Sequence, residues 1–427
     1  MKINKDRWKI NLLTLSGVDS KLRDIKKGKE THNVAQVLRN WYTLPYSFDI
    51  TPRTFLTTHE AFADKSIVLR SNVQLLSYEE EEVKFLELDP TADVLNVRKN
   101  PILLVAQLMF TDRVIILPRS IYDEMMEKFV DNRDKKVVWM FHTARCGSTL
   151  WAQIFYQLPN WTVFSESQTM FYSVLYARNE VNYQAFSKTK MYESIVLAYI
   201  RSYLRLVPDG HSVFWRAHAG LTEHMIPIIH KHFPKHQILF SYRNPIPTAK
   251  SFHRLLNALP IWQHRLRQVH ADMENEHPTG FSKVMRLFWT TGYNVNVCRQ
   301  AIKSSGIGPV VFEWSLLQRA ARITAIKEHQ ASGIPIKCVK YEDLVADARS
   351  VISSVFDYIG ISVDLVEIGQ KAMELDSQAG LAFSRENRVR HEDWVRTEEA
   401  IRRCNKLHRF FKLPELDEEF TMPDTLT

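Results

Sequence analysis

Residues 137–158 read VVWMFHTARCGSTLWAQIFYQL, and this stretch decides the fold class. Its first five residues are all apolar, which is typical of a strand buried on both faces of a parallel sheet. A tight turn is expected at Gly147. After the turn, apolar residues recur at helical spacing, at Leu150, Trp151, Ile154, Phe155 and Leu158. The stretch therefore predicts a strand, a turn and a helix in immediate succession.

The chain after residue 136 repeats this alternation of short apolar runs and helical segments, the order typical of a parallel α/β sheet. Helices cover both faces of such a sheet, so its strands are apolar throughout. We predict buried strands at residues 137–141, 213–215, 238–242 and 336–340. The fold class that follows is α/β, with a parallel sheet flanked by helices over residues 136–427.

Residues 1–130 have a different pattern. An acidic tract at residues 79–82 and the pair Asp89 and Pro90 separate short β-type runs, which favours antiparallel strands. We predict strands at residues 66–69, 73–76, 83–88, 103–110 and 114–117, and a helix near residues 121–130. A polar hinge at 131–136 ends this N-terminal β-rich accessory region, whose sequence indicates no function.

The composition is that of a folded protein, with 45% of the 427 residues hydrophobic and 24% charged. The net charge of +8 favours anionic partners. The sequence contains no long run of Lys or Arg and no basic stripe that alternates with aromatic residues, which argues against nucleic acid. A small polyanionic ligand fits the same charge.

Cysteine usage and hydropathy predict a cytoplasmic protein without metal or membrane span. The four cysteines lie far apart and form no CxxC pair, so neither a disulfide framework nor a zinc site is expected. The N-terminal segment has no apolar run of signal-peptide length. The most apolar stretch, residues 101–118, is interrupted by Asp112 and Arg113 and is not expected to cross a bilayer.

The predicted turn has the residue types of an anion site. A strand that turns sharply into a helix directs backbone N–H groups and the helix N-terminus at one point. Ser148 and Thr149 add hydroxyl donors, and Arg145 adds a planar cation suited to oxyanions. The Walker A loop of ATP-binding proteins needs a Lys where this chain has Ser148. The sequence therefore argues against transfer of an ATP γ-phosphoryl group.

The order Arg145, Cys146, Gly147, Ser148, Thr149 resembles the 5′-phosphosulfate loop of sulfotransferases, enzymes that use 3′-phosphoadenosine-5′-phosphosulfate (PAPS). The Arg form is similar to that of tyrosylprotein sulfotransferases. This resemblance implies a P-loop NTPase-like fold and these five residues as binding groups for PAPS and its product PAP. It implies no metal.

A second stretch, residues 237–256, resembles the family's site for the nucleotide 3′-phosphate. Arg243 ends a predicted strand, Pro245 and Pro247 suit the first turn of a helix, and Ser251 lies inside that helix. The spacing from Arg243 to Ser251 matches the family pattern. Ligands of open α/β sheets bind outside the carboxyl ends of the strands, so Arg243 and Arg145 are expected to face one crevice.

Two further segments resemble the family. Residues 340–361 are similar to its strand–YEDL–helix element, and we interpret Glu342 and Asp343 there as turn and cap residues. Residues 383–394 resemble the basic loop that closes over the 3′-phosphate, which makes Arg385, Arg388 and Arg390 candidates for cofactor binding. The family's glycine-containing loop sequence is not reproduced there.

Two residues are candidates for the catalytic base. Glu166 follows the loop helix and a short β run, at a position that matches the catalytic Glu of tyrosylprotein sulfotransferases. Arg216, Ala217 and His218 resemble the Lys-Thr-His of cytosolic sulfotransferases, in which the His is the base. Histidine titrates near neutral pH, whereas a glutamate must be shifted by burial. The choice between Glu166 and His218 as the base stays open. Arg145 is the predicted catalytic cation.

The predicted activity is transfer of a sulfuryl group from PAPS to a hydroxyl or amine acceptor. The acceptor pocket is expected from the segments around residues 165–200 and 252–295, whose aromatic, His and Arg side chains suit small aromatic, sugar or peptide acceptors about equally. Two alternatives remain: a catalytically inactive scaffold that binds PAP or PAPS, and a nucleotide kinase-like enzyme.

Overall fold

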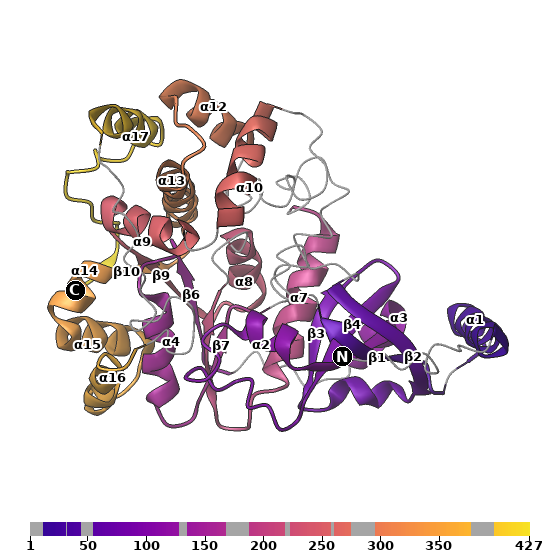
Figure 1. Ribbon diagram of the computed structural model, residues 1–427. Helices are drawn as coiled ribbons and strands as arrows, with labels where there is room; N and C mark the ends of the chain where they lie inside the picture. Colours follow the sequence, from indigo (N-terminus) through magenta and orange to yellow (C-terminus); the bar gives the residue numbers. More distant parts are fainter. Residues whose placement is uncertain are drawn as a thin grey trace, which may run out of the picture.

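A parallel sheet of six strands lies at the centre of the molecule, and a smaller antiparallel sheet lies beside it (Figure 1). The computed structural model describes residues 12–30, 32–43, 54–127, 135–167, 188–217, 223–257, 260–274, 295–376 and 397–427. The predicted α/β class with an antiparallel β-rich region at the N-terminal side is confirmed.

The strand order of the parallel sheet is β11-β10-β9-β6-β8-β7, and every neighbouring pair is parallel. The strands are β6 (Val137–His142), β7 (Trp161–Ser165), β8 (Ser212–Arg216), β9 (Gln237–Tyr242), β10 (Ile336–Lys340) and β11 (Thr425–Leu426). All four predicted buried strands are present, and β7 is the short β run expected before Glu166. Only β11 was missed, because two residues carry no periodic signal.

The path of the chain creates a switch point between β6 and β9. From β6 the chain passes through helix α4 (Ser148–Gln157) to β7 and β8 on one side of the sheet, and then crosses to β9, β10 and β11 on the other. The connections that leave β6 and β9 therefore run in opposite directions. Open α/β sheets bind ligands at the carboxyl ends of such a strand pair.

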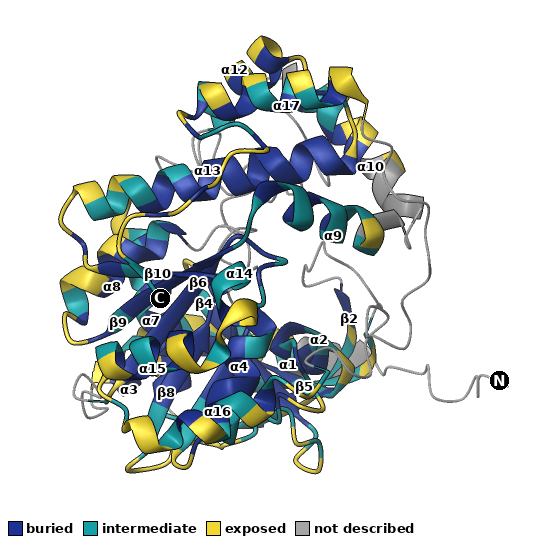
Figure 2. Ribbon diagram, turned by 90° about the vertical axis from the view of Figure 1, so that its left-hand side faces the viewer, coloured by how far each residue is buried: buried dark blue, intermediate teal, exposed yellow. Residues whose placement is uncertain are grey.

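Alternate side chains of the central strands point to opposite faces of the sheet. Val138 and Met140 pack with the cluster formed by α4, α15 (Ala348–Ile359) and α16 (Val366–Ala372). Trp139 and Phe141 belong to the opposite cluster, with α7 (Lys190–Leu204), α8 (Ile226–His232) and α13 (Val311–Ala331). Figure 2 shows α13 buried along most of its length. Both faces are covered, which explains why these strands are apolar throughout.

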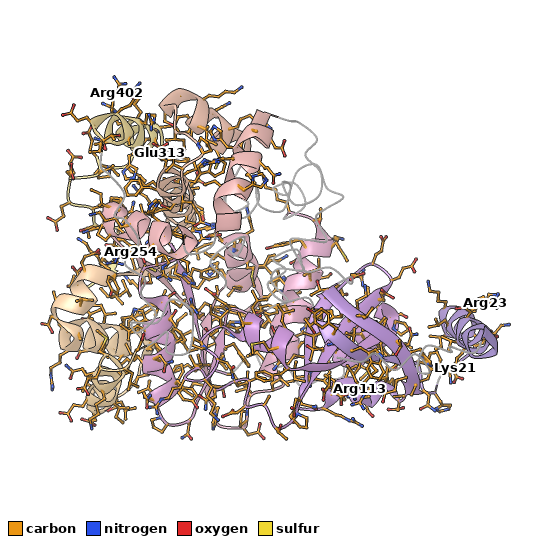
Figure 3. All side chains as sticks on the ribbon, viewed as in Figure 1. Lys21, Arg23, Arg113, Arg254, Glu313 and Arg402 are labelled. Carbon is orange, nitrogen blue, oxygen red and sulfur yellow. The ribbon has the colours of Figure 1, made fainter. Side chains whose placement is uncertain are left out.

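The antiparallel sheet has the order β2-β1-β5-β4-β3. Its strands are β1 (Ala35–Thr43), β2 (Phe55–Ala63), β3 (Val73–Tyr78), β4 (Glu82–Leu88) and β5 (Thr111–Pro118), and the helices beside it are α1 (Leu12–Lys26), α2 (Leu103–Met109) and α3 (Arg119–Glu127). Arg113 of β5, labelled in Figure 3, pairs with Glu60 of β2 at 2.9 Å and with Glu87 of β4 at 3.2 Å.

Two of the strands predicted in this region are wrong. Residues 66–69 lie in a 3₁₀ helix (Lys65–Leu69) that begins with a hydrogen bond from the N–H of Ser66 to the side chain of Asp64. Of residues 103–110, the first seven form α2 rather than a strand and Phe110 ends the helix, because Leu, Ala, Gln and Met favour a helix and the run has only one β-branched residue. Strands β1 and β2 were missed because most of their residues are not fully buried and lack apolar alternation.

The antiparallel sheet joins the parallel one through α2 and α7. Gln107 of α2 is fully buried, and its Nε2 donates to Gln74 Oε1 (2.6 Å) and to Tyr203 Oη (2.7 Å). One apolar cluster continues from Phe85 and Ile115 of the antiparallel sheet to Trp139 and Trp215 of the parallel sheet, together with Tyr199 of α7. The division at residues 130–136 stays a prediction, and residues 128–134 lie outside the described residues.

Candidate functional site

The loop after β6 is held in an unusual backbone conformation. Gly147 has φ = 81°, and a Cβ on it would lie 2.5 Å from the ring of Tyr341, so this position needs glycine for two reasons. Ala144 and Arg145 also lie in the left-handed region, with φ of 59° and 51°. Such conformations in non-glycine residues are costly and concentrate at functional sites.

Hydrogen bonds to β9 hold this loop at the switch point. The N–H of Thr143 donates to the Ser241 carbonyl (3.0 Å), and the Ser241 hydroxyl donates to the Cys146 carbonyl (3.1 Å). The Cys146 thiol is buried and donates to the Ser241 carbonyl at 3.2 Å. Its side chain therefore points into the core, and Cys146 can serve a ligand only through its main chain. The hydroxyl groups of Ser148 and Thr149 lie at the start of α4.

The two predicted anion motifs meet. Arg145 Nε donates to Ser251 Oγ at 2.9 Å, and Arg243 Nη1 donates to the Arg145 carbonyl at 3.3 Å. Ser251 lies in helix α9 (Pro245–Asn257), which begins with the two prolines as predicted. The guanidinium of Arg243 stacks on Tyr341, 4.5 Å from the ring centre. Residues far apart in sequence therefore place two arginines at one edge of the sheet.

The carboxylate of Glu342 lies beside Arg243. The Nε of Arg243 is buried and has no hydrogen-bond partner among the described residues, with the carboxylate of Glu342 at 3.6 Å. Glu342 accepts the N–H of Asn244 at 3.2 Å. Glu342 and Asp343, predicted as turn and cap residues, lie in the first turn of α14 (Tyr341–Ala346). No side chain that the structure describes caps the start of this helix, so the cap role is wrong, and Glu342 turns toward the Arg243 segment instead.

Helix α13 supports both strand ends from inside the molecule. Arg319 Nε donates to the Arg243 carbonyl (2.8 Å), and Arg322 Nη1 donates to the His142 carbonyl (2.7 Å). Both side chains are fully buried, and burial lowers the pKa of Arg319 to about 10. Sequence reasoning missed these residues, because an arginine in a helix is ordinarily a solvated residue.

Glu166 lies just after β7 in a buried polar cluster. Its side chain lies 2.8 Å from Arg216 Nη2 and 3.3 Å from His142 Nε2. The exposed fractions of Glu166, Arg216 and His142 are 7%, 6% and 3%. The backbone of Glu166 is also in the left-handed region, with φ = 52°. Arg216 also donates through Nε to Ser148 Oγ at 3.0 Å, so one side chain links the loop to Glu166.

His142, the last residue of β6, was not foreseen as a site residue. Its Nε2 also lies 2.9 Å from the Ala217 carbonyl, and the N–H of Ala144 donates to Nδ1 at 3.1 Å. This places the ring proton on Nε2, toward Glu166. Burial opposes protonation of the imidazole, but hydrogen bonds to Cys146 and Glu166 outweigh it and raise the pKa of His142. From the sequence alone, a histidine at the end of a buried strand is interpreted as a structural residue.

Four candidate site residues lie outside the described residues: His218, Arg385, Arg388 and Arg390. In the part of the chain that the structure describes, no group of three His, Cys, Asp or Glu side chains could hold a metal ion. Over the same residues, none of the helices combines the length and apolarity needed to cross a membrane.

Comparison with known proteins shows partial structural similarity to two sulfotransferases. The one from Alicyclobacillus acidocaldarius is 15% identical over 54% of this chain and 83% of its own length, with a TM-score of 0.33. The one from Mycobacterium tuberculosis H37Rv is 9% identical over 60% of this chain and 74% of its own length, with a TM-score of 0.29. No family model and no curated protein sequence matches the chain. Because both TM-scores are low, the fold class rests on the strand order described above.

Proposed function

We propose that this chain is a PAPS-dependent sulfotransferase that transfers a sulfuryl group to a hydroxyl or amine acceptor. The observation that carries the proposal is the hydrogen bond from Arg145 to Ser251, together with that from Arg243 to the Arg145 carbonyl. These contacts unite the phosphosulfate-like loop with the 3′-phosphate-like motif at the switch point of the sheet.

The groups at this edge fit a nucleotide with two separate anionic ends. The N–H groups of residues 145–149 and the start of α4 suit the 5′-phosphosulfate, since the first N–H groups of a helix have no acceptor within it. Arg243 and Ser251 suit the 3′-phosphate, because they bring a guanidinium and a hydroxyl group to this edge of the sheet. Arg385 and Arg388 are proposed to add to this end.

PAPS supplies an activated sulfuryl group when it is bound. Arg145 is proposed to supply the cation that would offset the charge developing on the departing phosphate oxygen. Glu166 is proposed to take the acceptor proton. Its carboxylate already pairs with Arg216 Nη2 at 2.8 Å, which leaves it less available to an acceptor proton. His218 therefore remains the alternative base.

A thermal-shift comparison of PAP, PAPS and ATP tests the proposal without an acceptor. PAP carries the 3′-phosphate that Arg243 and Ser251 are proposed to bind, and ATP does not. At a ligand concentration one hundred times its dissociation constant, PAP should stabilise the chain by about 2.7 kcal/mol. Equal shifts with ATP and PAP would contradict the proposal and favour the kinase-like alternative.

PAPS turnover separates the enzyme from a scaffold that only binds the nucleotide. Release of PAP from PAPS, first with water as the acceptor and then with phenol, sugar and peptide panels, is expected from the enzyme alone. PAP binding without any turnover would favour the scaffold. A cytoplasmic location and a soluble small-molecule, sugar or peptide acceptor remain predictions.

A further inference from the structure

We infer that the N-terminal region is a positioning element of the catalytic centre: residues 101–104, at the start of α2, hold Glu166 in its left-handed backbone conformation. This inference rests on the proposed function, because it concerns the residue proposed to take the acceptor proton. It assigns a role to a region whose sequence indicates none.

Two main-chain hydrogen bonds clamp Glu166. The N–H of Leu104 donates to the Glu166 carbonyl at 2.8 Å, and the N–H of Glu166 donates to the Arg216 carbonyl at 3.0 Å. Leu104 is the second residue of α2, so its N–H has no acceptor within the helix and is available to Glu166. A glutamate at φ = 52° is unfavourable by itself and persists only where its surroundings determine it.

The carbonyl of Pro101 organises the side chains around the Glu166 carboxylate. It accepts the Ser165 hydroxyl at 2.6 Å and Arg216 Nη1 at 3.3 Å. The same Nη1 of Arg216 donates to Ser165 Oγ at 2.9 Å. Arg216 is the ion-pair partner of Glu166, so a backbone group of the N-terminal region orients the cation beside the proposed base.

The segment is rigidly attached to the antiparallel sheet. Figure 1 shows α2 between β7 and that sheet, and α2 contacts β7. Gln107 of α2 is held between Gln74 of β3 and Tyr203 of α7, as described above. A further bond runs from Gln153 Nε2 of α4 to the Val97 carbonyl at 2.9 Å. The antiparallel sheet is thus connected to Glu166 through contiguous hydrogen-bonded residues.

The test removes the Leu104 N–H and leaves the candidate base intact. Leu104→Pro deletes only that donor from the main chain, and proline is tolerated in the first turn of a helix. Leu104→Ala keeps the N–H and loses only side-chain packing, so the ratio between the two variants measures the hydrogen bond. Each variant is assayed for PAP release from PAPS with water as the acceptor, and for PAP affinity by calorimetry.

We expect kcat of Leu104→Pro to fall roughly ten- to a hundredfold below that of Leu104→Ala, because a small displacement of a reacting group has effects of this size. The dissociation constant for PAP should stay within about twofold of the wild-type value in both variants, since the residues proposed to bind the nucleotide lie elsewhere. Equal kcat in the two variants, or equal loss of PAP affinity and kcat in Leu104→Pro, would overturn the inference.

Ser165→Ala provides a second variant should Leu104→Pro fail to fold. It removes the hydroxyl that bonds Pro101 and Arg216 at almost unchanged volume, and it should lower kcat roughly three- to tenfold with unchanged PAP affinity. Wild-type kcat in this variant would overturn the inference by itself. Failure of the unmodified protein to bind PAP or to release it from PAPS would instead contradict the proposed function.

Discussion

The two halves of the candidate site are built differently. The donor half consists of two contiguous motifs, the loop at residues 143–149 and the segment from Arg243 to Ser251, whose arginines are partly exposed. The Glu166 half draws on the ends of three strands, β6, β7 and β8, and on the backbone of the N-terminal region, and its charged groups are buried. The proposed nucleotide site is therefore assembled from local motifs, whereas the setting of the proposed base depends on long-range packing.

Replacement of Glu166 should separate the halves most strongly. Glu166→Gln is nearly isosteric, and loss of a general base typically lowers turnover by about 10²–10⁴. PAP affinity should stay near that of the unmodified protein, because Glu166 is not among the residues proposed to bind the nucleotide. Both quantities are measured by PAPS turnover and calorimetry.

His218→Asn is the matched comparison for Glu166→Gln. Full turnover in Glu166→Gln with a loss in His218→Asn would transfer the role of base to His218. Unchanged turnover in both variants would contradict the proposed division into a donor half and a base half.

Removal of Arg216 should destabilise the protein. Arg216→Met leaves the buried Glu166 carboxylate without its cation, and breaking a buried ion pair in this way costs about 3–5 kcal/mol of unfolding free energy. Urea unfolding measures the loss. The double variant Arg216→Met with Glu166→Gln should recover part of it, because the uncompensated charge is gone. No recovery would mean that the pair is not coupled.

Arg243→Ala tests the donor half by itself. Loss of a charged hydrogen-bonding group should weaken PAP binding roughly ten- to a hundredfold. The fold should survive, because Arg243 lies at a strand end and is only partly buried. Lys250→Ala, on the neighbouring helix, is a suitable control for net charge. PAP affinity equal to that of the unmodified chain would refute the assignment of Arg243.

Mild acid should weaken the fold. Burial lowers the pKa of His236 from 6.5 to about 4. The unfolded chain therefore binds more protons than the folded one between these values, and the contribution of His236 to stability, complete above pH 6.5, is lost as the pH falls toward 4. Between pH 7 and pH 5 the loss is about 2 kcal/mol.

Unfolding curves at the two pH values measure this loss. His236→Gln keeps an acceptor for Trp139 Nε1, which donates to His236 Nδ1 at 3.2 Å, and should reduce the pH dependence. An identical pH dependence in the variant would show that His236 is not its source.

The sequence by itself determined the α/β class and the two motifs of the proposed donor half. Strands buried on both faces leave uninterrupted apolar runs, and a turn into a helix leaves Gly147 followed by hydroxyl residues, because these signals arise between residues close in the chain. Arg243 follows the end of one strand and Ser251 lies in the next helix, so the spacing between them could also be recognised from the local sequence.

Only the tertiary structure decided the rest. The apolar run at residues 103–110 is compatible with a strand or a helix. In the structure it is helical, and Gln107 is hydrogen-bonded between Gln74 and Tyr203. The donation from Arg322 to the His142 carbonyl joins residues 180 positions apart. The setting of Glu166 likewise depends on contacts with Leu104 and Arg216. Such contacts exist only after the sheet has formed, because no local pattern specifies which distant residue will fill a buried polar position.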